Sequence, residues 1–226
     1  MWWTPDRIKW YERAAERCTF HRDLVKVIER HLNEGESILE LGCGLGRASA
    51  LLSRSHPIHA VDIDKAAIDT AMKREKADIY SVMDWKDLKE TADCVLCIFF
   101  GHLDRLELLP LQMNMAKRHA VFIYSEHRGQ KDDLVLKETT PKEEMERKLN
   151  ALGYGVESES FTLSFPQPLL SLEEAEEFIA LSYPKKSICD YLPFVTKSGD
   201  RDYPYVLKNE KKMLLFDISK QSVGSF

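Results

Sequence analysis

A glycine-rich stretch near the start of the chain constrains the fold more than any other feature of this 226-residue sequence. Its apolar run 38–41 predicts a strand, Gly42, Gly44 and Gly46 predict a tight turn, and residues 47–52 predict the start of a helix. Alternate glycines let a backbone approach a ligand closely, and the N–H groups at a helix start point into the same space. The stretch therefore predicts a strand–turn–helix unit that binds a polar ligand.

Two classes of ligand fit a turn of this kind. The dinucleotide fingerprint, Gly-x-Gly-x-x-Gly, would place its third glycine at position 47, which is Arg47. The observed spacing is Gly-x-Gly-x-Gly, and Glu40 lies two residues before the first glycine. A carboxylate there favours a ligand with a positive group, such as an ammonium, and repels a pyrophosphate.

The block 40–46, which reads ELGCGLG, closely resembles motif I of the class I S-adenosylmethionine-dependent methyltransferases. The resemblance implies that S-adenosylmethionine (SAM) is the cofactor and S-adenosylhomocysteine (SAH) the product. It also implies that the methionine end of SAM is held by Glu40, Gly42, Cys43, Gly44 and Gly46.

A second apolar run, 58–63, contains carboxylates at and just beyond its end. Asp62 lies about twenty residues after the glycines at a predicted strand tip, where a carboxylate accepts the ribose hydroxyls of an adenosine. The resemblance implies that Asp62 binds this ribose and that Ile63 packs on the adenine. Asp64 is instead expected to be the N-cap of a helix that begins at Lys65.

Asp84 and Trp85 follow a third short strand, predicted at 79–83. In the resembled family an acid at this point commonly bonds the adenine amino group, so we expect this pair to hold the adenine. The pair also fits an ordinary turn, because Asp is a frequent turn former. Phe99, at the end of the predicted fourth strand, completes the expected cofactor-binding set.

From residue 37 to about 126, predicted strands and helices alternate. This order predicts an α/β fold with a doubly wound, mostly parallel sheet. The resemblance implies a Rossmann-like methyltransferase fold of seven strands with an antiparallel last strand. We expect N-terminal helices covering the cofactor site (1–36), the core (37–165), a helical and aromatic insertion between strands six and seven that acts as a lid (166–204), and the final strand (205–226).

The composition limits the partners. The net charge of −5 and the pI of about 5.9 argue against broad binding to nucleic acid or anionic membranes. No apolar run approaches the roughly 18 residues of a membrane span. Five scattered cysteines, with Cys94 and Cys97 on opposite faces of one strand, predict a reduced, cytoplasmic protein without a metal site.

Candidates for catalysis lie after strands four and five. His102, Glu126 and His127 are positioned to bind the acceptor or to accept its proton, although a histidine that bonds the following helix is the commoner arrangement. Candidates for acceptor binding are aromatic, namely Tyr11, Tyr183 and Tyr191. The latter two also fit a small separate core beneath the insertion.

These features together predict a SAM-dependent methyltransferase of a small molecule. Family members that methylate nucleic-acid bases or glutamine carry Asn/Asp-Pro-Pro-aromatic after strand four, whereas residues 98–102 read IFFGH. Two alternatives stay open: a nicotinamide-dependent oxidoreductase on a similar sheet, and a non-catalytic cofactor-binding sensor or scaffold. The acceptor, the methylated atom and the oligomeric state are left open by the sequence.

Overall fold

A seven-stranded sheet with the strand order β3-β2-β1-β4-β5-β10-β6 forms the centre of the protein. The computed structural model describes residues 2–74, 79–100, 103, 105–125, 142–183 and 187–220. The strands of this sheet are β1 (Ile38–Leu41), β2 (Ile58–Asp62), β3 (Tyr80–Val82), β4 (Ala92–Ile98), β5 (Ala116–Ser125), β6 (Tyr154–Ser164) and β10 (Glu210–Lys220).

Strand directions confirm the predicted fold class. β1 to β5 pair in parallel, whereas β10 is antiparallel to both β5 and β6. As a result the carboxyl ends of β1 to β6 lie at one edge of the sheet. Ligands bind beyond that edge in folds of this kind.

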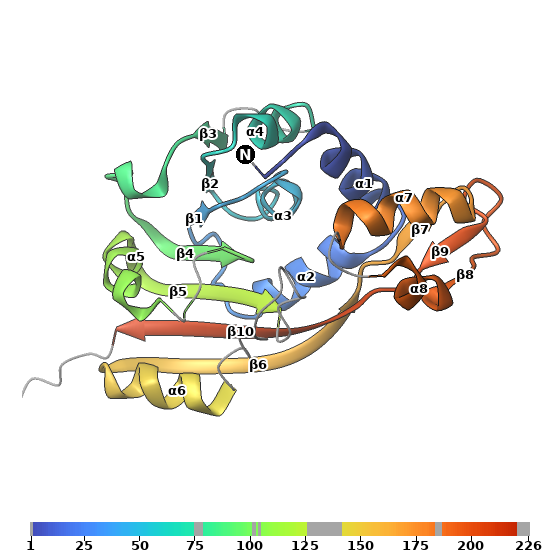
Figure 1. Cartoon of the computed structure of the whole chain (residues 1–226). Coiled ribbons are helices and arrows are strands. Elements are labelled where there is room, and N and C mark those ends of the chain that lie inside the picture. The colour runs from blue at the N-terminus through green and yellow to red at the C-terminus, as the bar shows by residue number, and fades with distance from the viewer. Residues whose placement is uncertain are drawn as a thin grey trace, which may run out of the picture.

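Helices cover both faces of the sheet (Figure 1). They are α1 (Pro5–Glu16), α2 (Phe20–Glu29), α3 (Arg47–Leu52), α4 (Lys65–Met72), α5 (Leu109–Met115) and α6 (Lys142–Ala151). Thr4 caps α1 through its side chain and Pro5 is the first helical residue. Pro110 lies in the first turn of α5, where a residue without a backbone N–H is tolerated.

Two hydrophobic cores lie on opposite faces of the sheet. One core includes Phe122 and Phe216 and the apolar sides of α5 and α6, and the other includes Leu24 of α2. Cys97 belongs to the first and Cys94 to the second, so these two free, buried cysteines face apart as predicted. Within the described residues, no helix combines the length and apolar composition needed to cross a membrane.

A second, three-stranded sheet lies between β6 and β10 in the chain. It comprises β7 (Gln167–Leu169), β9 (Tyr205–Leu207) and β8 (Val195–Lys197), and it is accompanied by α7 (Leu172–Ser182) and α8 (Ile188–Tyr191). Figure 1 shows this unit, which we call the insertion, beside α1 and beyond the ends of β6 and β10. Because β9 pairs with β7 and β8, the insertion continues three residues past the expected boundary at 204.

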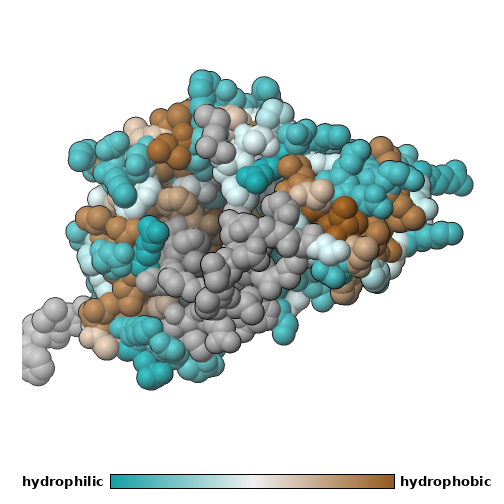
Figure 2. All heavy atoms as spheres, in the orientation of Figure 1, coloured by the Kyte–Doolittle hydropathy of each residue, from teal (hydrophilic) through white to brown (hydrophobic). Residues whose placement is uncertain are grey.

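The insertion has its own small core. Trp10 of α1 packs there with Leu169, Ala175, Ile179 and Leu207. Hydrophobic and hydrophilic side chains both reach the surface at this end of the molecule (Figure 2), where Leu172 and Phe194 are exposed. The insertion is therefore a folded unit attached to the main sheet through α1 and the ends of two long strands.

Gly46 joins α3 to the neighbouring strand. It is the N-cap of α3 with φ +66°, and its carbonyl accepts a hydrogen bond of 2.9 Å from the Tyr80 hydroxyl. A Cβ at this position would lie 2.7 Å from the Tyr80 ring and 2.8 Å from Ala71 Cβ. Glycine is therefore required here for packing as well as for backbone conformation.

We predict that Gly46→Ala destabilises the protein more than Gly35→Ala. Both glycines have positive φ, but a Cβ on Gly35 meets nothing within 4 Å. Gly35→Ala should cost about 1–2 kcal/mol of left-handed strain, and Gly46→Ala about 1–3 kcal/mol more through overpacking. Urea unfolding measures both, and equal losses of stability would contradict the packing role.

Candidate functional site

The glycine turn between β1 and α3 forms the floor of the candidate site. Gly42, Gly44 and Gly46 all adopt positive φ, at +70°, +55° and +66°. A Cβ on Gly42 would lie 2.2 Å from the Phe100 ring, and one on Gly44 would lie 3.2 Å from Trp3. The first two glycines therefore let aromatic side chains approach the turn, whereas Gly46 serves packing.

Asp62, the last residue of β2, fixes the shape of this turn. One carboxylate oxygen accepts the N–H of Gly44 at 2.8 Å, and the other accepts the N–H of Asp64 at 2.8 Å. Each carboxylate oxygen can accept a second hydrogen bond. Asp62 can thus support the backbone and still bind a ligand.

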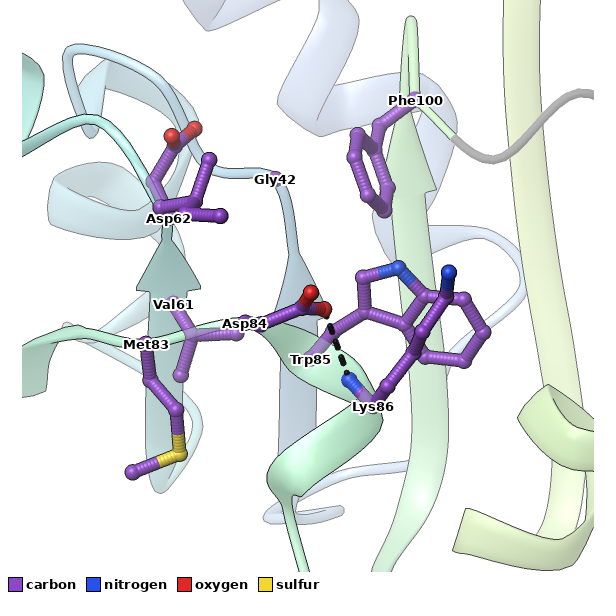
Figure 3. A pocket seen from close by; sticks show the side chains of 9 residues that line it. Gly42, Val61, Asp62, Met83, Asp84, Trp85, Lys86 and Phe100 are labelled. Atoms are coloured by element: carbon purple, nitrogen blue, oxygen red, sulfur yellow. Dashed lines mark hydrogen bonds between the residues drawn. The ribbon is translucent and has the colours of Figure 1, made fainter.

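A cavity of about 190 Å³ opens beside Asp62 at the carboxyl ends of β1, β2 and β3 (Figure 3). It is lined by Gly42, Val61, Asp62, Ile63, Met83, Asp84, Trp85, Lys86 and Phe100. Asp84 and Trp85 form one wall, and Phe100 stands opposite Asp62 across Gly42 (Figure 3). Among the residues that the structure describes, the Asp84 carboxylate accepts only the Lys86 N–H, at 3.0 Å, so it has capacity for a ligand.

Five residues expected to bind the cofactor line this cavity: Gly42, Asp62, Ile63, Asp84 and Trp85. Glu40, Cys43, Gly44, Gly46 and Phe99 lie outside the lining. Sequence reasoning missed Val61, Met83, Lys86 and Phe100. The position of Phe100 follows from the backbone: Phe99 adopts φ +55°, and the side chain of Phe100 lies against Gly42.

Glu40 lies in the strand beneath the turn with 2% of its surface exposed. Ser49 donates a hydrogen bond of 2.5 Å to it, and no lysine or arginine among the described residues forms an ion pair with it. Burial, assisted by the nearby charge of Asp62, raises the pKa of Glu40 to about 7. A positive group arriving in the turn would favour loss of the Glu40 proton.

The N-terminal residues are bound over the site by Asp64. One of its carboxylate oxygens accepts the N–H groups of Trp2 and Trp3 at 3.1 and 3.0 Å. The other accepts the Ala66 N–H at 3.1 Å, which confirms Asp64 as the N-cap of α4. This single side chain therefore starts a helix and holds Trp3 near Gly44.

α1 is bound over the turn by an ion-pair cluster. Glu12 accepts hydrogen bonds from Arg47 of α3, at 2.6 and 3.1 Å, and from Arg74, which follows α4. Arg74 also donates to the Leu45 carbonyl at 2.6 Å. Arg47, which replaces the third glycine of a dinucleotide site, therefore attaches a covering helix.

The residues expected to bind the acceptor separate into two places. Tyr11 is on α1, with its ring centroid 5.3 Å from that of Trp3 and its hydroxyl bonded to His21 at 2.8 Å. Tyr183 and Tyr191 stack on each other at 4.3 Å in the small core of the insertion, away from the cavity. The catalytic candidates His102, Glu126 and His127 lie outside the described residues.

One group of possible metal ligands lies among the described residues, toward the edge of the sheet opposite the cavity. His31, Glu157 and Asp217 place one ligand atom each within 4.8 Å of one another. His31 already bonds Asp217 and Glu159, at 3.3 and 3.2 Å. Since His31, which follows α2, already has carboxylate partners on β6 and β10, we read the group as an ion network that joins this segment to the two strands.

Comparison with known proteins supports the resemblance seen in the sequence. A family model described as a methyltransferase domain matches residues 38–118. The ribosomal protein L11 methyltransferase of Thermotoga petrophila is 26% identical over 115 residues, which are 48% of this chain and 43% of that protein. The chain thus matches less than half the length of this curated relative.

Solved structures share the fold. The magnesium protoporphyrin IX methyltransferase of Synechocystis, solved with bound SAM, has a TM-score of 0.51 at 12% identity, covering 88% of this chain and 78% of that one. A SAM-dependent methyltransferase of Thiobacillus denitrificans, solved with SAH, has a TM-score of 0.52 at 14% identity, covering 95% and 98%. The chain therefore matches a methyltransferase-domain model over residues 38–118 and shares the overall fold of these solved structures.

Proposed function

We propose that the chain binds SAM across the tips of β1, β2 and β3 and transfers its methyl group to a small-molecule acceptor. The observation that carries this proposal is the cavity of Figure 3, which has Asp62 on one side and Asp84 with Trp85 on the other. Two carboxylates, with an aromatic ring beside one of them, suit a ribose and an adenine amino group.

The acidic side chains fit two parts of the cofactor. Asp62 would accept the ribose hydroxyls and Asp84 the adenine amino group, whereas the N–H groups of Gly42, Cys43, Gly44 and Gly46 already donate within the protein. Glu40 lies beneath the turn without a basic partner among the described residues, so it would balance the ammonium charge. Gly42 and Gly44 let Phe100 and Trp3 lie close against the turn, where a Cβ would be 2.2 and 3.2 Å from these two side chains.

The protein's contribution to the reaction is alignment and exclusion of water. When bound, SAM supplies a methyl group on a positively charged sulfur: the acceptor atom attacks in line, the carbon–sulfur bond breaks, its electron pair stays on sulfur, and SAH is released. Trp3 and Phe100 cover the turn, and the pairing of Glu12 with Arg47 holds α1 in place above it. These contacts keep the reacting groups away from solvent.

A small molecule is the acceptor class that the chain's chemistry supports best. The net charge is −5, and the Asn/Asp-Pro-Pro-aromatic motif does not follow β4. Two of the three similar proteins named above differ in acceptor by their titles, one a methyltransferase of ribosomal protein L11 and the other of magnesium protoporphyrin IX. The acceptor class therefore has to be argued from this chain's own residues.

Tritiated SAM tests this assignment directly. The protein is incubated with separated small-molecule, RNA and protein fractions of a cell extract, and the label in each fraction is counted. We expect enzyme-dependent label in the small-molecule fraction. Label confined to RNA or protein would contradict the acceptor class, and tighter binding of NAD than of SAH in calorimetry would contradict the cofactor.

We predict that Asp62→Ala weakens SAH binding. The change removes charge-assisted hydrogen bonds to the ribose and should cost roughly 1.5–3 kcal/mol of binding free energy. Asp69→Ala, an exposed carboxylate on α4 that pairs with Lys65, is the matched control and should leave affinity unchanged. Calorimetry that finds the two variants alike would count against the ribose role.

We also predict that SAH binding tightens as pH rises through 7. The pKa of Glu40 is about 7, so at pH 6 about 90% of this carboxyl is protonated and at pH 8 about 90% is ionised. If the ligand's ammonium requires the ionised form, affinity should rise about tenfold between these pH values. Glu40→Gln should abolish this rise, whereas a flat wild-type profile would exclude the coupling.

A further inference from the structure

Aromatic side chains from four separate segments meet beside the glycine turn. Phe20 and Phe165 lie with ring centroids 5.0 Å apart, Tyr11 and Phe165 5.2 Å, and Phe20 and Phe99 6.4 Å. We call Tyr11, Phe20, His21, Phe99 and Phe165 the aromatic cluster. Phe99 follows β4 and Phe165 follows β6, so the cluster lies beyond the carboxyl edge of the sheet.

The cluster adjoins the proposed cofactor site. Trp3 contacts both the turn at Gly44 and the ring of Tyr11. Phe99 immediately precedes Phe100, whose ring lies on Gly42. An acceptor molecule bound at the cluster would thus be next to the methionine end of the cofactor.

A partly buried hydrogen bond joins two side chains that form one wall of the cluster. The Tyr11 hydroxyl and His21 Nε2 are 2.8 Å apart. Burial, together with the charges of Arg47, Arg74 and Lys211, lowers the pKa of His21 to about 3, so the imidazole is neutral. This wall carries no charge of its own at neutral pH, so the charge at the cluster comes from a neighbour.

Phe99 is held in a strained and exposed position. Its φ of +55° is rare for a bulky residue, and 40% of its surface is exposed. Its N–H donates to the Ile123 carbonyl at 2.7 Å, which holds the backbone in place. Strain of this kind clusters at ligand sites, where the fold maintains an unfavourable conformation to present a side chain.

Lys211 supplies a positive charge without a carboxylate partner. Its Nζ lies 5.7 Å from the Phe99 ring centroid and 5.6 Å from that of Phe165. No ion pair joins Lys211 to an acid within the described part of the chain, and burial lowers the pKa of its ammonium. Two aromatic faces stabilise this cation only partly, so an anion would gain by pairing with it.

We propose that the acceptor is a small aromatic anion that places its ring on Phe99 and its anionic group on the Lys211 ammonium. This inference rests on the proposed function and names the substrate class of the same site. Phe99 provides a flat apolar surface, and Lys211 a desolvated charge above it. An aromatic carboxylate that carries a hydroxyl to be methylated has this chemistry.

The test uses 4-hydroxybenzoate and its neutral analogue 4-hydroxybenzamide as probes. Binding of each to the full chain saturated with SAH is measured by calorimetry and ligand-observed NMR. We expect the carboxylate to bind at least about tenfold more tightly than the amide, as a charged hydrogen bond implies. This comparison needs no variant, so it does not depend on the folding of a mutant.

Variants then assign the effect to Lys211. Lys211→Met should weaken the binding of 4-hydroxybenzoate about tenfold or more and leave the binding of 4-hydroxybenzamide unchanged. Lys211→Arg should keep most of the preference for the carboxylate over the amide. Lys212→Met is the matched control, because it removes the same charge from the adjacent exposed position of β10. Circular dichroism and SAH affinity are measured for every variant.

Two results would overturn the proposal. One is equal binding, or no binding, of the two probes by wild-type protein that binds SAH. The other is loss of the preference in Lys212→Met but not in Lys211→Met. Failure of the wild type to bind SAH at all would instead refute the cofactor assignment, so the two failures are distinguishable.

Discussion

The carboxylate of Asp62 is the group on which the geometry of this site depends. It ends β2 and accepts N–H groups from Gly44 and Asp64, so one side chain sets the spacing between the glycine turn and the start of α4. The N–H groups of Gly42 and Cys43 bond the Val61 carbonyl instead, so Asp62 completes the pairing of the turn. Because an anion fills this structural position, the same group is available for the ribose contact proposed above.

The N-terminal segment depends on this arrangement in turn. Asp64 holds the N–H groups of Trp2 and Trp3, and Glu12 holds Arg47 and Arg74. The partly buried pairing of Glu12 with two guanidinium groups costs desolvation that only good geometry repays. Charged side chains therefore attach residues 2–16 to α3 and to the start of α4, next to the glycine turn.

The main sheet could be predicted from the sequence, and half of the residues expected to bind the cofactor line the cavity. Both follow from local sequence patterns. Strand–helix alternation and the spacing of Gly42, Asp62 and Asp84 report on strand tips, which a parallel sheet brings together. The contact of Phe100 with the cavity was not predicted. It depends on the left-handed backbone of Phe99, which cannot be inferred from the residue type. The strands of the insertion were not predicted either, because a strand of three residues is too short to show an alternating hydrophobic pattern.

α1 presents two faces to two different neighbours. Glu12 bonds Arg47 of α3. On the other side, the ring centroids of Trp10 and Phe178 are 5.3 Å apart, and Arg13 forms a 2.8 Å ion pair with Glu174; Phe178 and Glu174 belong to α7 of the insertion. A rigid helix cannot move against one neighbour without moving against the other. Any displacement of α1 would therefore change its contacts with α3 and with α7 together, so this helix physically connects the glycine turn to the insertion.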